Sequence, residues 1–346
     1  MNFEPMTISG LEPRPEWWRV RPAEITETCE AVRRGRHQVI ARTPGGYPVH
    51  AVFYGDFSEP APQTNWSAGS AAGVDCYFRR AGMPQTVVWC AGIHGAEAEG
   101  VAFAVNLIEL LEHGRDLLGR RHDRLLEMLD SYRLVILPCV NMDGRAISPD
   151  HLRGVPYEVF RRASQGVWPD GSLIGWLGSK EYFPLPLDRV SYPGGYPNSE
   201  GFNIMHDACP GHIRTAEARA LLQLAEHYAV DFLLNAHSCE GEPFLLPPSE
   251  FDYRSHVARG LDACRMVNRA LYDAGLRRTP PSEPAAGHGV NLNNLVALAS
   301  GGLAMTLECS VWGELSFEQL LDVNFLTFET LLESGLKVPF VNRHAL

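Results

Sequence analysis

Short apolar runs alternate along this chain with longer amphipathic stretches. Residues 86–91, 134–140 and 232–236 are almost wholly apolar, as expected of strands that are covered on both faces of a sheet. Between the first two runs, residues 97–113 repeat apolar side chains at spacings of three and four, which is the period of an amphipathic helix. Strands that alternate with helices predict one α/β domain with a mostly parallel or mixed sheet.

The rest of the pattern suggests how the chain is organised. Residues 1–36 read as a lead-in segment, and residues 37–346 as the α/β domain. The stretch 145–209 has no clean period, and such a long irregular region inside a compact domain is usually functional. We therefore expect an irregular insertion at about 154–200. The other expected elements are a hairpin (37–42 and 47–54), strands (74–79 and 303–309) and helices (24–33, 116–129, 215–228, 253–274 and 316–334).

Composition narrows the class of partner. The chain has 30 Lys and Arg against 41 Asp and Glu, a formal net charge of −11, whereas nucleic-acid and anionic-membrane binding need clustered cations. The sequence contains no apolar run of about 18 residues, the minimum for a membrane span. Eight cysteines without a CxxC pair favour free thiols and a cytoplasmic location. We expect neither a nucleic-acid nor a membrane partner, and the oligomeric state stays open.

Polar side chains follow or end three of the predicted strands. His94 and Glu97 come just after the strand at 86–91, His237 follows the strand at 232–236, and Glu308 lies near the end of the strand at 303–309. In open α/β sheets, ligands bind at the carboxyl ends of the strands. We therefore expect these four side chains to share one site.

The residue types favour a zinc site. Catalytic zinc takes three protein ligands, commonly His and Glu, and leaves one position open. A tight turn into a helix places His94 and Glu97 on one side, and His237 would be the third ligand. Zinc lowers the pKa of a bound water toward about 7, and Glu308 is placed to take up and return the proton. Taken singly, each residue also has a purely structural interpretation, such as a helix-dipole contact for Glu97; it is the combination that points to zinc.

The order of the motifs resembles that of the zinc carboxypeptidases of the carboxypeptidase A type. These motifs are HxxE at 94–97, Asn-x-Asp-Gly at 141–144, His-Ser at 237–238 and a late strand ending in Glu308. The similarity extends over about residues 38–335. It implies a single-domain, three-layer α/β/α sandwich with a mixed, mostly parallel, eight-stranded sheet. It also implies that His94, Glu97 and His237 hold one zinc ion, with Glu308 as general base and acid.

The resemblance further implies an arginine, shortly after the Asn-x-Asp-Gly motif, that stabilises the oxyanion. Such an electrostatic contribution is typically worth about 3 kcal/mol. Arg153 is our candidate for this role. Arg145, Arg161 and Arg162 stay open as alternatives, because the insertion leaves more than one way to align this part of the sequence with the family's arginine.

Substrate recognition departs from the family pattern. Met205 and His206 stand where the family has the Asn-Arg pair that grips a terminal carboxylate. Methionine donates no hydrogen bond, and histidine is a weaker, pH-dependent substitute for a guanidinium group. The candidate substrate contacts are His206, Asn203, Lys180 and His288.

Two of these candidates keep a structural alternative. The insertion either folds over the cleft and supplies an aromatic wall and the Lys180 cation, or covers the surface with Trp176 in a small core of its own. His288 lies in the neighbourhood of the family's mobile tyrosine, and is either a substrate contact or an ordinary loop histidine.

Together these features predict a zinc-dependent amide-bond hydrolase that acts on a peptide or an acyl-amino acid through a zinc-activated water. One alternative is an N-deacylase or amidohydrolase resembling the succinylglutamate desuccinylase and aspartoacylase branch, which shares HxxE and a distal histidine. Another is a non-catalytic binding relative, against which the retention of three ligands and Glu308 argues.

Overall fold

A mixed β-sheet forms the centre of the computed structural model, which describes residues 3–58, 83–209 and 211–341. Within these residues the sheet has seven strands in the order β1-β2-β4-β3-β5-β7-β6. The four central strands β4, β3, β5 and β7 are parallel, whereas the flanking strands pair antiparallel. The strands are β1 (Arg36–Arg42), β2 (Pro48–Tyr54), β3 (Gln85–Ala91), β4 (Tyr132–Leu137), β5 (Phe232–Cys239), β6 (Phe244–Leu246) and β7 (Leu303–Ser310).

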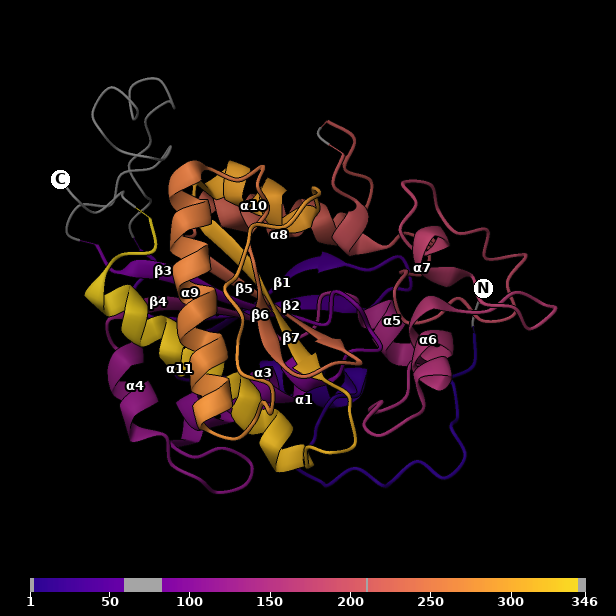
Figure 1. The fold of residues 1–346 in the computed structure, drawn as a ribbon, viewed down its shortest axis with the longest axis horizontal. Coiled ribbons are helices and arrows are strands. Elements are labelled where there is room, and N and C mark those ends of the chain that lie inside the picture. The colour runs from indigo at the N-terminus through magenta and orange to yellow at the C-terminus, as the bar shows by residue number, and fades with distance from the viewer. Residues whose placement is uncertain (1–2, 59–82, 210, 342–346) are drawn as a thin grey trace.

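Helices cover both faces of this sheet, so the predicted three-layer α/β/α fold is confirmed. In Figure 1, α8 and α10 lie along the upper side of the sheet, and α1, α3, α4 and α11 lie below it. The helices are α1 (Pro22–Ala31), α3 (Glu99–His113), α4 (Asp123–Leu129), α5 (Met142–Ile147), α6 (Tyr157–Gln165), α7 (Gly175–Gly178), α8 (Ala216–His227), α9 (Arg254–Asp273), α10 (Leu292–Ser300) and α11 (Phe317–Lys337), with a 3-10 turn η1 (Ile204–His206).

The apolar runs of the central strands form a core on each face of the sheet. Side chains alternate between the two faces along a strand, so Trp89 packs with Phe103 and Phe328 on one side, while Val88 belongs to the core on the other. The predicted lead-in segment contributes Trp18 to the first of these cores. Residues 1–36 are therefore packed onto the α/β body where they are described.

Some elements differ from the sequence expectation, each for a physical reason. Helix α4 begins at Asp123 rather than at residue 116, because the Asp116 carboxylate accepts the backbone N–H groups of Leu118 and Arg120 and holds a loop there. Helix α10 was not predicted, because it is buried on nearly all sides and so lacks an amphipathic period. The described sheet has seven strands rather than eight, and the strand predicted at 74–79 lies outside the described residues.

The predicted irregular stretch carries the short helices α5, α6 and α7, which gather at the right-hand end of the molecule in Figure 1. The seven cysteines in the described ranges are free. Among the helices of the same ranges, none combines the length and apolar character that a membrane span requires.

Candidate active site

His94 and Glu97 are presented by a tight turn at the end of β3. Gly92 adopts a left-handed conformation with φ of +61°, and a Cβ there would lie 2.6 Å from the Cys139 sulfur. Gly95 packs so closely against the start of α5 that a Cβ would lie 2.2 Å from the Arg145 backbone nitrogen. The glycines between the strand and the helix thus let the chain turn and bring both side chains to the edge of the sheet.

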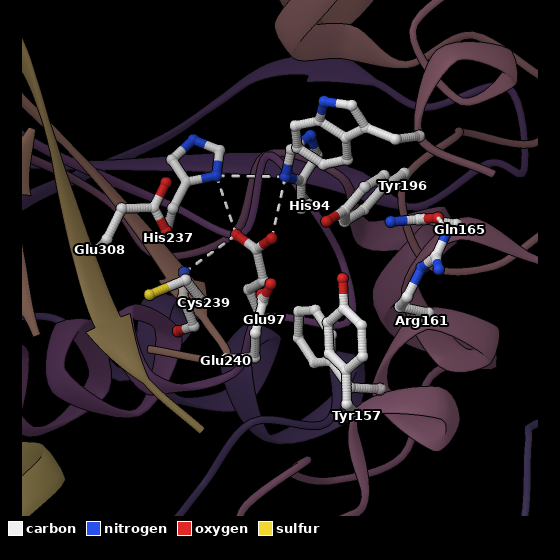
Figure 2. Close-up of a pocket in the computed structure, with 13 residues that line it drawn as sticks. His94, Glu97, Tyr157, Arg161, Gln165, Tyr196, His237, Cys239, Glu240 and Glu308 are labelled. Atoms are coloured by element: carbon white, nitrogen blue, oxygen red, sulfur yellow. Dashed lines mark hydrogen bonds and ion pairs between the residues drawn. The ribbon is translucent and has the colours of Figure 1, made fainter. Parts of the chain in front are cut away.

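His237 and Glu308 come from the two strands that follow β3 across the sheet. In the parallel pairing of β5 with β7, His237 is the partner of Glu308. Paired residues on neighbouring strands direct their side chains to the same face. The carboxyl ends of β3, β5 and β7 therefore bring all four predicted residues into one pocket, which Figure 2 shows.

Three of these side chains converge on a single point. The Glu97 carboxylate lies 3.0 Å from His94 Nδ1 through one oxygen and 2.8 Å from His237 Nδ1 through the other. The two Nδ1 atoms are 3.2 Å apart. The Ser238 backbone N–H also donates to Glu97. All three side chains are buried, with at most 6% of each exposed.

This donor set fits a zinc ion. The possible ligand atoms of His94, Glu97 and His237 all lie within 4.8 Å of one another, and zinc is commonly held by two imidazole nitrogens and a carboxylate. His94 Nε2 donates to Asn203 Oδ1 at 3.2 Å, which leaves Nδ1 with its lone pair toward the common point. Two ring nitrogens that face each other at such short range need a proton or a cation between them.

Burial and charge shape the acid-base properties of the pocket. Burial alone would raise the pKa of Glu97, but His94 and His237 together hold it below its ordinary value. For Glu308, burial raises the pKa to about 8; Glu97 and Glu240 add to this effect, and His237 and Lys180 oppose it. Two neighbouring carboxyl groups thus have pKa values shifted in opposite directions, an arrangement typical of catalytic sites.

Beside the ligands lies a cavity of about 430 Å³. One wall is acidic, with Glu308 and Glu240, and the opposite wall carries Arg161. Several aromatic rings form the remaining walls of the cavity. The further lining residues are Tyr157, Phe160, Gln165, Trp176, Tyr196, Ser238 and Cys239.

Arg161 is the arginine of this cavity, and Arg153 lies elsewhere. The Arg153 guanidinium pairs with Glu12 and donates to the backbone carbonyls of Gly313 and Leu315. This bonding holds Arg153 away from the pocket lining. The other two alternatives are also bonded to backbone: Arg145 to the carbonyls of Ser148 and Pro149, and Arg162 to that of Gly171.

The insertion supplies a cation and an aromatic ring beside the metal ligands. Lys180 Nζ lies 3.5 Å from the centre of the Trp176 ring, a close cation–π contact. Trp176 lines the cavity and is 49% exposed, so it is not plugged into a small core of its own. Burial lowers the pKa of His206 to about 3, and the nearby Lys180 adds to this effect. His206 is thus neutral at neutral pH, and the charge on this side belongs to Lys180.

The other two candidate substrate contacts are engaged differently. Asn203 uses its oxygen for His94 and its amide nitrogen for the Ser179 carbonyl at 2.7 Å. It therefore positions a ligand and ties the insertion to the site. His288 pairs with Glu250 at 2.8 Å, with 83% of its side chain exposed, and does not belong to the cavity lining.

The Asn-x-Asp-Gly motif holds the far end of the insertion. Asn141 Nδ2 donates to the carbonyls of Gly195, Tyr196 and Pro197. Asp143 accepts the backbone N–H groups of Ser199 and Gly45 at 2.9 and 3.0 Å. These bonds place Tyr196 flat against His94, with ring centres 3.9 Å apart. The sequence analysis missed Tyr196, because no local pattern marks it.

Comparisons with known proteins agree with this geometry. Residues 36–167 match the family model described as zinc carboxypeptidase. A metallo-carboxypeptidase from Burkholderia cenocepacia is similar in structure, with a TM-score of 0.55 and 15% identity over 91% of this chain and 68% of that chain. For a Pseudomonas aeruginosa metallo-carboxypeptidase in complex with (2-guanidinoethylmercapto)succinic acid, the TM-score is 0.57 and the identity 16%, with the same coverage.

A third similar structure is that of thrombin activatable fibrinolysis inhibitor, with a TM-score of 0.51 and 14% identity over 91% of this chain and 75% of that chain. No curated protein sequence matches this chain. At such low identity, the solved structures establish the shared fold.

The fold and the His-Glu-His site define a zinc metallohydrolase, with one zinc ion per chain as its cofactor. Within that class, residues 36–167 match the zinc carboxypeptidase family model, and the chain shares the fold of metallo-carboxypeptidases that are 15–16% identical to it.

Proposed function

We propose that this protein hydrolyses an amide bond in a peptide or an acyl-amino acid, with Glu308 as general base and acid. One observation carries the proposal: Glu308 and the three metal-ligand side chains line one wall of the same cavity into which Arg161 faces from the other. The cavity thus holds an acid-base group and a cation on opposite sides of the space for a substrate, the arrangement that acyl transfer to water requires.

His94, Glu97 and His237 would hold the zinc ion. When bound, zinc supplies a Lewis acid that polarises a carbonyl and makes water acidic. The chain's own groups orient the side chains that would hold the zinc ion. Asn203 fixes the orientation of His94 through its Nε2–H, and the Ser238 N–H fixes the Glu97 carboxylate. Hydrogen bonds to the atoms of a ligand side chain that face away from the metal hold that ligand in position.

Glu308 moves the proton. A zinc ion held by the neighbouring side chains would favour the ionised form of Glu308. Its carboxylate oxygen then takes a proton from the attacking water and passes it to the departing nitrogen, so that one group serves as base and then as acid. Arg161 donates to the carbonyl oxygen as negative charge develops on it, an interaction worth about 3 kcal/mol in comparable sites.

Lys180 would bind a carboxylate of the substrate. Its charge acts on His206, which is itself neutral and stands at the position where the family has its Asn-Arg pair, and its ammonium group lies against Trp176 of the cavity lining. The ligand of the Pseudomonas aeruginosa enzyme is a succinic acid derivative, which is a dicarboxylate; a carboxylate-bearing substrate is therefore our first choice here.

The test compares an N-acylated dipeptide with the same dipeptide carrying a C-terminal amide, both offered to the zinc-loaded protein. We expect the free acid to be cleaved and the amide to be cleaved at least about 10-fold less efficiently, because one charge-assisted hydrogen bond is lost. Equal cleavage of the acid and the amide would show that the protein does not recognise a carboxylate of the substrate. No cleavage of any peptide or acyl-amino acid by protein that holds its zinc would overturn the proposed function.

A further inference from the structure

Tyr196 is tightly constrained within the wall of the cavity. Its ring stacks on His94 with an interplanar angle of 24°, and its edge contacts Trp176 at 6.4 Å between ring centres. Only 3% of the residue is exposed. The backbone on either side is bonded to Asn141 Nδ2. The ring therefore has one position, against a metal ligand and within the cavity wall.

The hydroxyl group of Tyr196 points into the cavity. Figure 2 shows it directed from the wall that carries Arg161 and Gln165 toward Glu97, with the Tyr157 hydroxyl pointing into the same space from below. Among the residues that the structure describes, none forms a hydrogen bond with the Tyr196 hydroxyl. A tyrosine hydroxyl at the end of an otherwise buried ring ordinarily finds a partner. At this position the partner must come from whatever occupies the cavity.

The direction of the hydroxyl limits which substrate atom it meets. Glu308 lies on the far side of the metal ligands from Tyr196 in Figure 2, beside His237, whereas Tyr196 lies beside His94. With Glu308 serving the water and the departing nitrogen, the carbonyl oxygen of the scissile amide is the atom that faces the opposite wall. That wall holds Arg161 and the Tyr196 hydroxyl.

We propose that Tyr196 is a catalytic residue whose O–H donates a hydrogen bond to the carbonyl oxygen of the scissile amide as that oxygen gains negative charge. The inference rests on the proposed function. The proton stays on the tyrosine throughout, so the step adds no proton transfer to the reaction. Because the ring is held by His94 and Asn141, the donor is in place before the substrate arrives, which is the condition under which such donors are most effective.

The experiment replaces Tyr196 by phenylalanine, which keeps the ring and its stacking on His94 and removes only the hydroxyl. Three quantities are measured on the zinc-loaded protein: kcat and KM for an N-acylated dipeptide, zinc affinity by competition with a chelator, and the Kd of a phosphinic dipeptide analogue by calorimetry. The phosphinate carries a negative oxygen where the carbonyl oxygen would be during the reaction.

For Tyr196→Phe we expect kcat to fall about 100-fold with little change in KM, and the phosphinate to bind on the order of 10- to 100-fold more weakly. Zinc affinity should be unchanged. The matched control is Tyr192→Phe in the same insertion, whose hydroxyl donates to the Ile147 carbonyl; it should leave kcat and the phosphinate Kd as they are.

A purely structural role for Tyr196 would lower zinc affinity or thermal stability, and would leave the phosphinate Kd of the zinc-saturated variant unchanged. That result, or unchanged kcat and Kd, overturns the inference alone. If wild-type protein retains zinc yet neither cleaves the dipeptide nor binds the phosphinate, the proposed function fails, and the role of Tyr196 fails with it. If Tyr196→Phe does not fold, 4-fluorophenylalanine at this position supplies the comparison, because it keeps the ring and lacks the hydroxyl, and it must show the same loss of kcat.

Discussion

His237 and Glu308 are paired residues of the neighbouring parallel strands β5 and β7. The sheet itself thus fixes the spacing between a proposed metal ligand and the proposed acid-base group, without help from a loop. Sites carried by strands hold their geometry better than sites carried by loops. Substitution of Glu308 should therefore leave the position of His237 unchanged.

Glu308→Gln should abolish turnover and leave the metal in place. The amide matches the carboxylate in shape but cannot accept and return a proton, so kcat should fall by at least about 100-fold. Elemental analysis of the purified variant should still find one zinc per chain. Near-normal kcat in the variant would show that another group carries the proton.

Asn203→Ala should weaken zinc binding although Asn203 is no ligand. Loss of the bond to His94 Nε2 frees the ring to rotate, and loss of the hydrogen bond that orients a ligating histidine typically costs about 10- to 100-fold in metal affinity. His237→Ala, which removes a ligand, should cost more, and His288→Ala on the exposed loop should cost nothing. Chelator competition measures all three, and an unchanged affinity for Asn203→Ala would contradict the role given to this residue.

Substitution of Arg161 should lower activity, whereas substitution of Arg153 should lower stability. Arg161→Ala removes the cation of the cavity and should lower kcat about 100-fold. Arg153→Ala breaks bonds to Glu12 and to the Gly313 and Leu315 carbonyls, so it should lower the free energy of unfolding by about 1–3 kcal/mol with turnover per folded molecule retained. The opposite pattern would return the oxyanion role to Arg153.

Lys180 can be tested with an internal control, because the chain has only two lysines, Lys180 and Lys337. Lys180→Met keeps an unbranched stem against Trp176 and removes the charge, so KM for a substrate with a free carboxylate should rise about 10-fold or more. The matched C-terminal amide should show no such rise. Lys337→Met, at an exposed pair with Glu333, should change neither. A KM that responds equally for acid and amide would rule out a carboxylate contact.

Stability at low pH should depend on Asp116. Burial would raise the pKa of this carboxyl, but hydrogen bonds from His122 and Arg120 lower it to about 2. Because the folded pKa is below the unfolded value of about 3.9, the stabilisation is fully present above pH 4 and is lost as the pH falls toward 2. Asp116→Asn should lower the free energy of unfolding by about 1–2 kcal/mol at neutral pH, after allowance for solvent screening. The free energy of unfolding of this variant should also fall less steeply between pH 4 and pH 2. Urea unfolding at pH 7 and pH 3 measures both effects.

The sequence predicts the sheet well, because its central strands are apolar on both faces and the helices between them are amphipathic. It also places His94, Glu97, His237 and Glu308 together, because carboxyl ends of parallel strands meet at one edge. The sequence does not place Arg161 or Tyr196 in the cavity. Their positions depend on the path of the insertion. Backbone bonds join the end of α6 to residues 195 and 196, and Asn141 donates to the carbonyls of residues 195–197; such long-range bonds leave no local signature.

The contacts of Asn141 and Asp143 also bear on the order in which the molecule comes apart. They join the turn at 43–45, the start of α5 and the segment at 195–199, so the wall that carries Tyr196 exists only while three distant segments meet. The sheet beneath it has two apolar cores of its own. Segments held by few polar contacts open at lower free energy than core strands. Mild denaturant should therefore open the wall that carries Tyr196 first, and the proposed activity should disappear while the strands of the sheet are still in place.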